Sequence, residues 1–260
     1  MLAGLSREEL LHEALVRTRD SFVPFEGMRV VRRPGWSQLI TPMFLQGGFN
    51  EVALAQMDPT EADDVIAATI AEYDALGIQF RWTVGPDSAP ADLGARLAAH
   101  GLVGERVVMM AAAIDEVLAR LPVEPAIRIE PVTADNVEDY VTVSAAGWGC
   151  DPERLRFYQR VLQADAGGRH HGCVAYVDGV AAGIGNHVRF ERSAYLIGGV
   201  VLPEFRGRGV YRALIAARLQ QARDAGLAVV TTQARATTSA PILARLGFVA
   251  LMECETYHRA

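Results

Sequence analysis

One order of helices, strands and turn residues occurs twice along this chain of 260 residues, and this repetition limits the fold more than any other feature. In the first half, a predicted helix ends at Gly77, a strand follows, and Ser88-Ala89-Pro90 precedes a second helix and a final strand. In the second half, a helix ends at Gly226, and a strand, Ser239-Ala240-Pro241, a helix and a final strand follow in the same order. Repeated supersecondary units of this kind predict a duplication, with helices and strands alternating in each copy.

The repeat sets the predicted domain boundaries and the fold class. We expect an α/β fold of the α+β type, with two lobes formed by residues 1–121 and 126–260 and joined near Pro122–Pro125. Each lobe should hold a mixed, mostly antiparallel sheet flanked by helices. Only twelve residues follow Phe248, enough for one strand. Because an unpaired sheet edge is prone to aggregation, the final strand of one lobe is expected to lie against the other lobe.

Composition excludes several classes of function. The net charge of −6 gives no general attraction to nucleic acid or to anionic membranes. All basic residues are arginine, so no lysine is present to form a Schiff base. Cys150, Cys173 and Cys254 are widely separated and show no metal-ligand spacing, which predicts reduced thiols and no metal centre.

Neither a signal peptide nor a membrane span is predicted. The first twenty residues carry seven charged residues among the apolar ones, a pattern typical of an amphipathic helix. No stretch approaches the roughly 18 uninterrupted apolar residues that a membrane helix needs. We therefore expect a soluble, cytoplasmic protein that binds neither nucleic acid nor membrane.

The segment Ala194–Leu214, with the sequence AYLIGGVVLPEFRGRGVYRAL, carries the clearest chemical signal. An apolar strand ends at Leu202-Pro203, and a glycine- and arginine-rich turn leads directly into a predicted helix. Unpaired N–H groups and the helix dipole make such a helix start an anion site. Gly207 and Gly209 let the backbone approach a phosphate, while nearby arginines add charged donors. The segment predicts a pyrophosphate site.

Other interpretations of this turn are a surface loop before a basic helix, a dinucleotide-binding loop and a P-loop. The glycine spacing does not fit the GxGxxG pattern of a dinucleotide-binding loop. A P-loop requires a Gly-Lys pair, and the chain has no lysine. The surface loop remains the structural alternative.

Residues 206–211 resemble the R/Q-x-x-G-x-G/A signature of the GNAT N-acetyltransferase superfamily. The preceding strand with its Pro-Glu exit and the later sequence SAPILARLGF are also similar to that family. The resemblance implies acetyl-CoA as co-substrate and two GNAT-like lobes, with the backbone of Val200 and Leu202 pairing with the pantetheine arm and polarising the thioester. The residues expected to bind the co-substrate are Val200, Val201, Leu202, Arg206, Gly207, Arg208, Gly209, Val210, Tyr211 and Arg212.

Two positions depart from the family pattern. Tyr211 stands where the signature ends in a small residue. Leu243 stands where many members carry the tyrosine that protonates the departing thiolate. Neither change affects the backbone of the turn, so binding of acetyl-CoA is better supported than acid catalysis by a tyrosine.

The first half lacks the features of the pyrophosphate site. Its corresponding junction, Gln56–Glu61, has neither glycine nor arginine, and residues 55–76 contain six acidic residues and no basic one. Acidic groups at a helix start stabilise the helix dipole and repel a pyrophosphate. The sequence therefore predicts a degenerate N-terminal lobe and an active C-terminal lobe.

Acetylation of an amine needs a base that removes a proton and, in many cases, an acid for the leaving thiolate. Candidate catalytic residues are Glu191, His187 and Tyr257, with the His170-His171 pair as a further source of a base. For each of these residues, a structural role is the alternative. The general base and the general acid thus remain unknown at this stage.

The predicted function is transfer of an acetyl group from acetyl-CoA to an amine of a small molecule or protein. The alternative from another class is an acyl-CoA-binding pseudoenzyme or sensor. A thiol or cysteinyl-sugar acceptor, as in the tandem mycothiol synthases of the superfamily, is also open. Predicted partners are a small-molecule or peptide amine and, as an open alternative, a second copy of the chain in a homodimer.

Overall fold

The computed structural model describes residues 2–45, 47–122, 126–165 and 167–259. The chain divides into two compact units that are not contiguous in sequence. Unit 1 comprises the described residues of Met1–Val23, Met109–Ala234 and Thr238–Leu251, and unit 2 those of Pro24–Val108, Arg235–Thr237 and Met252–Ala260. The linker predicted near Pro122–Pro125 includes residues 123–125, which lie outside the described residues. The two domains predicted at residues 1–121 and 126–260 stay a prediction.

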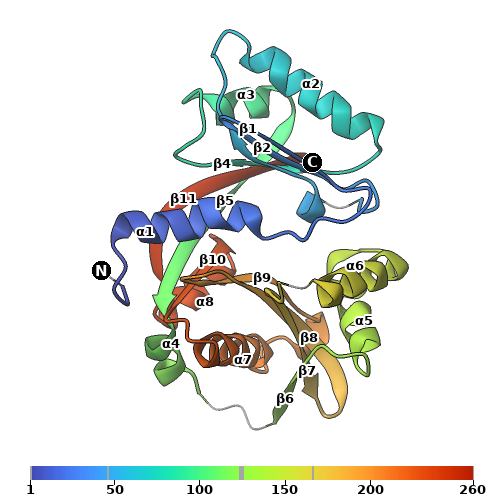
Figure 1. Ribbon diagram of the computed structural model, residues 1–260, viewed down its shortest axis with the longest axis vertical. Helices are drawn as coiled ribbons and strands as arrows, with labels where there is room; N and C mark the ends of the chain where they lie inside the picture. Colours follow the sequence, from blue (N-terminus) through green and yellow to red (C-terminus); the bar gives the residue numbers. More distant parts are fainter. Residues whose placement is uncertain (1, 46, 123–125, 166, 260) are drawn as a thin grey trace. The chain divides into compact units, whose positions relative to one another are not determined.

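Unit 1 has a mixed sheet with strand order β10-β9-β8-β7-β6 (Figure 1). The β9–β10 pair is parallel and the other pairs are antiparallel. Its strands are β6 (Ile127–Pro131), β7 (His170–Val177), β8 (Val180–Arg189), β9 (Ala194–Val201) and β10 (Val229–Arg235). Its α-helices are α1 (Arg7–Leu11), α4 (Ile114–Arg120), α5 (Val137–Trp148), α6 (Pro152–Ala164), α7 (Val210–Asp224) and α8 (Ser239–Arg245).

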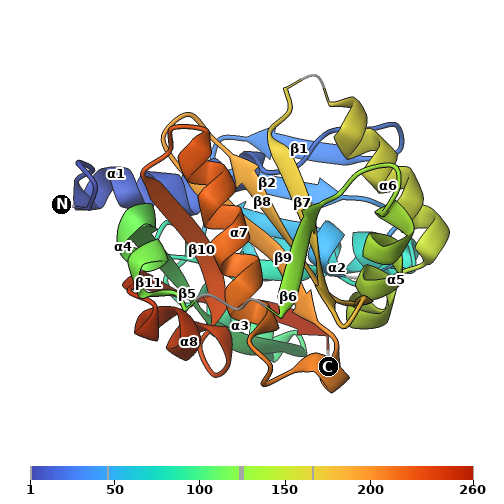
Figure 2. The ribbon, with the colours of Figure 1, turned by 90° about the horizontal axis from the view of Figure 1, so that it is seen from below.

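Helices α5 and α7 cover opposite faces of this sheet, and Figure 2 shows α7 in front of the strands. Side chains alternate between the two faces of a strand. On β7, Cys173, Ala175 and Val177 pack against Val210 and Leu214 of α7. The intervening residues of β7 pack against the α5 side chains Tyr140 and Val143, in a cluster completed by Val174, Tyr176 and Ile184. This alternation explains the nearly continuous apolar sequence of β7.

The N-terminal segment belongs to unit 1, although the sequence analysis includes it in the lobe predicted at residues 1–121. Helix α1 continues into a π-helical turn, η1 (His12–Val16), and a 3-10 turn, η2 (Arg17–Asp20). Glu13 is buried and accepts a hydrogen bond of 2.5 Å from the Ser193 hydroxyl, while Glu9 pairs with Arg192 at 2.8 Å. Both contacts attach the segment to the turn between β8 and β9.

Unit 2 repeats part of this design. Its strands pair in the order β1-β2-β3-β4-β11, with β3 and β4 parallel and the other pairs antiparallel. Its elements are β1 (Arg29–Arg33), β2 (Trp36–Ile40), η3 (Gly47–Phe49), β3 (Glu51–Ala55), α2 (Ala62–Ala75), β4 (Arg81–Val84) and α3 (Leu93–Ala99). The order β3–α2–β4–α3 matches β9–α7–β10–α8 of unit 1. The mixed, mostly antiparallel α/β class is confirmed.

Two long strands contribute to both units, namely β5 (Leu102–Ala113) and β11 (Val249–Arg259). In the last strand of the chain, residues 255–258 of β11 pair with residues 81–84 of β4, in the first half of the sequence. The aromatic core of unit 2 includes Trp36, Tyr73 and Trp82. The Tyr73 hydroxyl donates to the Leu39 carbonyl at 2.9 Å, which satisfies a polar group inside that core.

No helix among the described residues combines the length and the apolar character required to cross a bilayer.

Candidate functional site at the start of helix α7

Strand β9 separates from β10 halfway along its length. The described parallel pairing runs from Ala194 to Leu196 and ends there, where the Thr232 hydroxyl donates to the Leu196 carbonyl at 3.0 Å. Next along β9, a β-bulge at Gly198-Gly199 interrupts the pairing with β8, because two residues of β9 stand opposite Gly185 alone. A bulge bends and twists its strand. It therefore turns the last residues of β9 away from β10 just before the glycine-rich turn.

The backbone of Val201 points to the edge of β9 that faces away from β8. Leu202 donates its N–H to the Ala182 carbonyl at 3.0 Å, so this group is engaged with β8. Because successive residues of a strand direct their N–H and C=O groups to opposite edges, Val201 directs these groups away from β8. The Val201 carbonyl accepts a hydrogen bond from Arg206 Nε at 3.3 Å. The backbone of Val200 and Leu202 was expected to pair with the pantetheine arm, whereas the Leu202 N–H here donates to Ala182.

The turn after β9 brings the chain into α7 with positive φ at both glycines. A short 3-10 turn, η4 (Pro203–Phe205), leads to Gly207 with φ +76° and to Gly209 with φ +89°. Gly209 is the N-cap residue of α7, and no side chain caps the helix there. The first turn of a fifteen-residue helix therefore directs its backbone N–H groups and the positive end of its dipole to this loop.

Three exposed arginines surround this helix start: Arg206, Arg208 and Arg212. The Arg208 guanidinium forms an ion pair of 2.9 Å with Asp178, in the turn between β7 and β8. Surface ion pairs of this kind contribute little free energy. An anionic ligand with two or more negative charges can thus displace Asp178 from Arg208.

Tyr211 turns its ring back toward the bulge and away from the loop. A Cβ atom built on Gly199 would lie 3.8 Å from Tyr211 Cε2, so the ring and the bulge are neighbours. The side chain is half-buried, and this burial raises the pKa of its phenol. Val210 is buried and packs under the sheet with Leu214. The large residue at the end of the signature therefore fills space beneath β9, and the backbone of the turn keeps its exposed position.

The candidate bases from the sequence lie apart from this turn. Glu191 is exposed in the turn between β8 and β9, at the end of β9 that is remote from the bulge. His170 lies on β7, and its Nε2 contacts the Ser21 carbonyl at 2.6 Å. The structure does not bring these residues together with the residues of the glycine-rich turn.

His187 is completely buried between β7, β8 and α7. Its ring stacks on that of His171 with centroids 4.9 Å apart, and neither ring nitrogen has a hydrogen-bond partner among the described residues. Burial first, and then the neighbouring His171 and Arg218, lower its pKa to about 3. A neutral imidazole with this pKa is a very weak base and does not reach solvent. We therefore assign His187 to the core.

Tyr257 lies in the core of unit 2 and not in the unit that carries the glycine-rich turn. It stands opposite Trp82 in the β4–β11 pair and packs beside Gly94 and Gly104. Its hydroxyl donates to the Glu255 carboxylate. Burial and this carboxylate raise its pKa to about 12. Leu243, at the position of the family tyrosine, is buried in α8.

Residues 194–235 form, in order, a strand with a bulge, a glycine-rich turn, an uncapped helix start and a parallel strand. Residues 134–248 match the sequence model of the Acetyltransferase (GNAT) family. The match to a GNAT acetyltransferase domain thus covers this segment of the chain. The domain supports an acyltransferase as the general class of the protein.

Solved structures with the same fold cover nearly the whole chain. A conserved protein of unknown function from Staphylococcus epidermidis has a TM-score of 0.68 at 15% identity, over 91% of this chain and 95% of that chain. A GCN5-related N-acetyltransferase from Kribbella flavida has a TM-score of 0.66 at 16% identity, over 99% and 96%. A tandem GNAT protein from the clavulanic acid biosynthesis pathway has a TM-score of 0.61 at 18% identity, over 96% and 93%. No curated protein matches the sequence.

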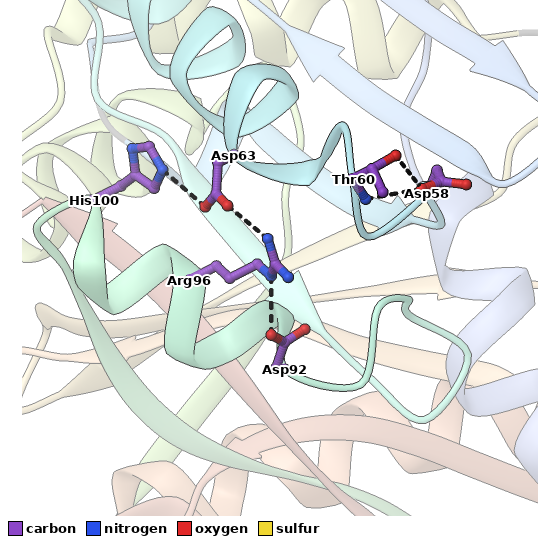
Figure 3. A network of polar contacts seen from close by, with 6 residues as sticks. All are labelled: Asp58, Thr60, Asp63, Asp92, Arg96 and His100. Atoms are coloured by element: carbon purple, nitrogen blue, oxygen red, sulfur yellow. Dashed lines mark hydrogen bonds and ion pairs between the residues drawn. The ribbon is translucent and has the colours of Figure 1, made fainter.

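The start of α2 in unit 2 corresponds in element order to the start of α7, and its arrangement is different (Figure 3). Just before α2, the Asp58 carboxylate accepts hydrogen bonds from the N–H and the hydroxyl of Thr60, within the same loop. Asp63, in the first turn of α2, pairs with Arg96 of α3 at 2.6 Å and contacts His100 at 3.3 Å. Carboxylates thus occupy the helix start, and the nearby arginine already binds them.

The described residues contain no group of three or more His, Cys, Asp or Glu side chains arranged to hold a metal ion. Cys150, Cys173 and Cys254 are all buried.

Proposed function

We propose that the protein is an N-acetyltransferase that uses acetyl-CoA and acts on an amine of a small molecule or peptide. In this proposal, the pyrophosphate binds at residues 206–212 and the acetyl thioester lies along residues 199–201. The observation that carries it is the separation of β9 from β10 directly before an uncapped α7, which leaves an outward strand edge and a helix start adjacent in sequence.

The backbone groups assign roles to the two ends of acetyl-CoA. The first N–H groups of α7 bind the pyrophosphate, with Arg206, Arg208 and Arg212 as charged donors. The Val201 N–H donates to the thioester carbonyl and stabilises the negative charge that forms on that oxygen. The amine nitrogen then bonds to the acetyl carbon, the carbon–sulfur bond breaks, and the proton of the amine passes to solvent or to a base. A thiol with a pKa near ~8.5 can leave as thiolate at neutral pH.

Thiol release from acetyl-CoA in the presence of amines tests this function. The panel contains amino acids, polyamines, aminoglycosides and short peptides, together with a cysteinyl sugar for the thiol alternative. We expect at least one amine to raise thiol release well above hydrolysis. Tight binding of acetyl-CoA with no acceptor-dependent release would instead favour a sensor or pseudoenzyme.

Arg208→Ala should weaken acetyl-CoA binding by about 1.5–3 kcal/mol, the value of a hydrogen bond to a charged group. Arg223→Ala is the matched control, because Arg223 stands at the other end of α7 with the same 47% exposure and also pairs with an aspartate. Asp178→Ala should leave binding equal or slightly tighter, since it releases Arg208. Calorimetry measures all three variants. Equal losses in Arg208→Ala and Arg223→Ala would refute a specific role for Arg208.

We also propose that unit 2 is degenerate, so acetyl-CoA should bind once per chain. Carboxylates at the start of α2 repel a pyrophosphate, and Arg96 is engaged with Asp63. Calorimetric titration should give a stoichiometry of one, and Asp63→Ala should leave it unchanged. Two equivalent sites per chain would contradict the degenerate assignment.

Tyr257→Phe should lower kcat less than tenfold, because its hydroxyl is bonded to Glu255 within the core of unit 2. A positioned acid typically contributes about 10²–10⁴-fold, so loss of a true acid is easy to detect. The measurement is steady-state kinetics with an acceptor from the amine panel. A hundredfold loss of kcat with unchanged acetyl-CoA affinity would make Tyr257 the acid.

The cytoplasmic location expected from the sequence stays a prediction.

A further inference from the structure

The bulge of β9 is contacted by polar side chains on both faces of the sheet. On the α5 face, the Asn186 side-chain amide donates to the Gly198 carbonyl at 3.3 Å. On the α7 face, the Arg218 guanidinium lies beside Gly199, with NH1 and NH2 each 3.8 Å from a Cβ built there. Arg218 also donates to the Asn186 backbone carbonyl at 3.1 Å. Asn186 therefore connects both sets of contacts.

The Asn186 amide is contacted by the Tyr140 hydroxyl of α5 through both of its polar atoms. The amide nitrogen and the Tyr140 oxygen are 2.8 Å apart, and the Tyr140 hydroxyl is 3.0 Å from the amide oxygen. Glycines make room for the amide on two sides, since a Cβ at Gly172 or at Gly198 would lie 2.9 Å from it. These close approaches indicate that this amide and the bulge fit together at a fixed distance.

The shape of the bulge decides which backbone groups β9 presents. Gly198 has φ +59°, a conformation that a regular strand does not contain. A shift of one residue in the β8–β9 register would exchange the two edges of the strand, so that Val200 and Leu202 would replace Val201 at the outer edge. A contact that fixes Gly198 therefore also fixes Val201.

Resting on the proposed function, we propose that Asn186 is a positioning residue: it holds the Gly198-Gly199 bulge so that the Val201 N–H meets the acyl group of acetyl-CoA. Asn186 acts through the backbone of β9 and does not itself touch the acyl group. Tyr140 supports it from α5, and Arg218 anchors its backbone from α7.

The test compares two ligands that share one half. Adenosine 3′-phosphate 5′-diphosphate carries the pyrophosphate and lacks the pantetheine arm, whereas acetyl-CoA carries both. The ratio of the Kd for the nucleotide to the Kd for acetyl-CoA therefore measures the affinity that the outer edge of β9 adds. In Asn186→Leu, which keeps the size and removes the amide, this ratio should fall about tenfold, equivalent to one lost hydrogen-bonded arrangement. The nucleotide alone should bind within about twofold of wild type.

Two tyrosine variants complete the test. Tyr140→Phe should reduce the ratio about threefold, because Asn186 keeps its bond to Gly198 and loses its support. Tyr176→Phe is the matched control: Tyr176 lies in the same apolar cluster, is equally buried, and bonds Asp139 instead. It should leave the ratio unchanged even if it lowers the melting temperature.

The outcomes separate this inference from the proposed function. If wild type binds acetyl-CoA no more tightly than the nucleotide, the proposed function fails. If wild type shows the ratio and Asn186→Leu retains it with normal nucleotide affinity, the positioning role is overturned. If Asn186→Leu does not bind the nucleotide, the ratio in Tyr140→Phe is compared with the ratio in Tyr176→Phe. A lower ratio in Tyr140→Phe supports the positioning role, and equal ratios overturn it.

Discussion

Gly209→Val should abolish binding of acetyl-CoA at concentrations that saturate the wild-type protein. Gly209 has φ +89° at the start of α7, and a β-branched side chain there would stand between the backbone N–H groups and the pyrophosphate. The substitution also strains the backbone by about 1–2 kcal/mol, because L residues with a side chain disfavour this region. Calorimetry with acetyl-CoA measures the loss.

Gly226→Val separates blocked binding from general strain. Gly226 follows the other end of α7 with φ +83°, and a Cβ there meets open space. Both variants should lose similar stability, measured as the free energy of unfolding, and only Gly209→Val should lose binding. Normal affinity in Gly209→Val, or an equal loss in Gly226→Val, would remove the helix start from the binding site.

Acidification should destabilise the protein through His187. Burial lowers the pKa of His187 in the folded protein to about 3, below the ordinary histidine value of 6.5, so the unfolded chain binds the extra proton first. Stability from this group is complete above pH ~6.5 and falls as the pH drops toward the folded value, by at most about 1.4 kcal/mol per pH unit. Between pH 7 and pH 5 the expected loss is about 2 kcal/mol.

His187→Leu should remove this part of the pH dependence, since leucine has a similar volume and no proton to bind. Urea unfolding of wild type and variant at pH 7 and pH 5 gives the difference. His258→Leu is the control, because it replaces an exposed histidine of β11 in place of a buried one. A wild-type slope that persists in His187→Leu would show that other groups cause the acid sensitivity, including His170 and His171, whose pKa values burial also lowers.

The glycine-rich turn before α7 could be predicted because its signal is local. Leu202-Pro203 ends a strand, two glycines permit positive φ, and three arginines follow in sequence. The repeat could be seen for the same reason, because Gly77 and Gly226 each mark the end of a helix. The presence of one final strand followed from counting the residues after Phe248. Local rules sufficed for these features.

Features that depend on tertiary contacts could not be read from the sequence. Gly198-Gly199 indicates an irregular strand, but only the register with β8 shows that two residues oppose Gly185, which moves the outward backbone from Leu202 to Val201. His187 looked like a candidate base because histidine titrates near neutral pH, and its burial becomes evident only once β7 and α7 cover it.

Two helix starts also depend on more than the local sequence. Helix α5 begins after Thr133, with Asn136 as the N-cap residue, and the Asn136 side chain accepts a hydrogen bond from the Thr133 N–H at 2.8 Å. Helix α4 follows β5 directly, without a glycine or proline between them.

A crystal structure of the protein with acetyl-CoA tests the central claim most directly. We predict one ligand per chain, with its pyrophosphate at the first N–H groups of α7 and its acyl oxygen within hydrogen-bonding distance of the Val201 nitrogen. A ligand bound at the start of α2, or one whose thioester lies away from β9, would contradict this account.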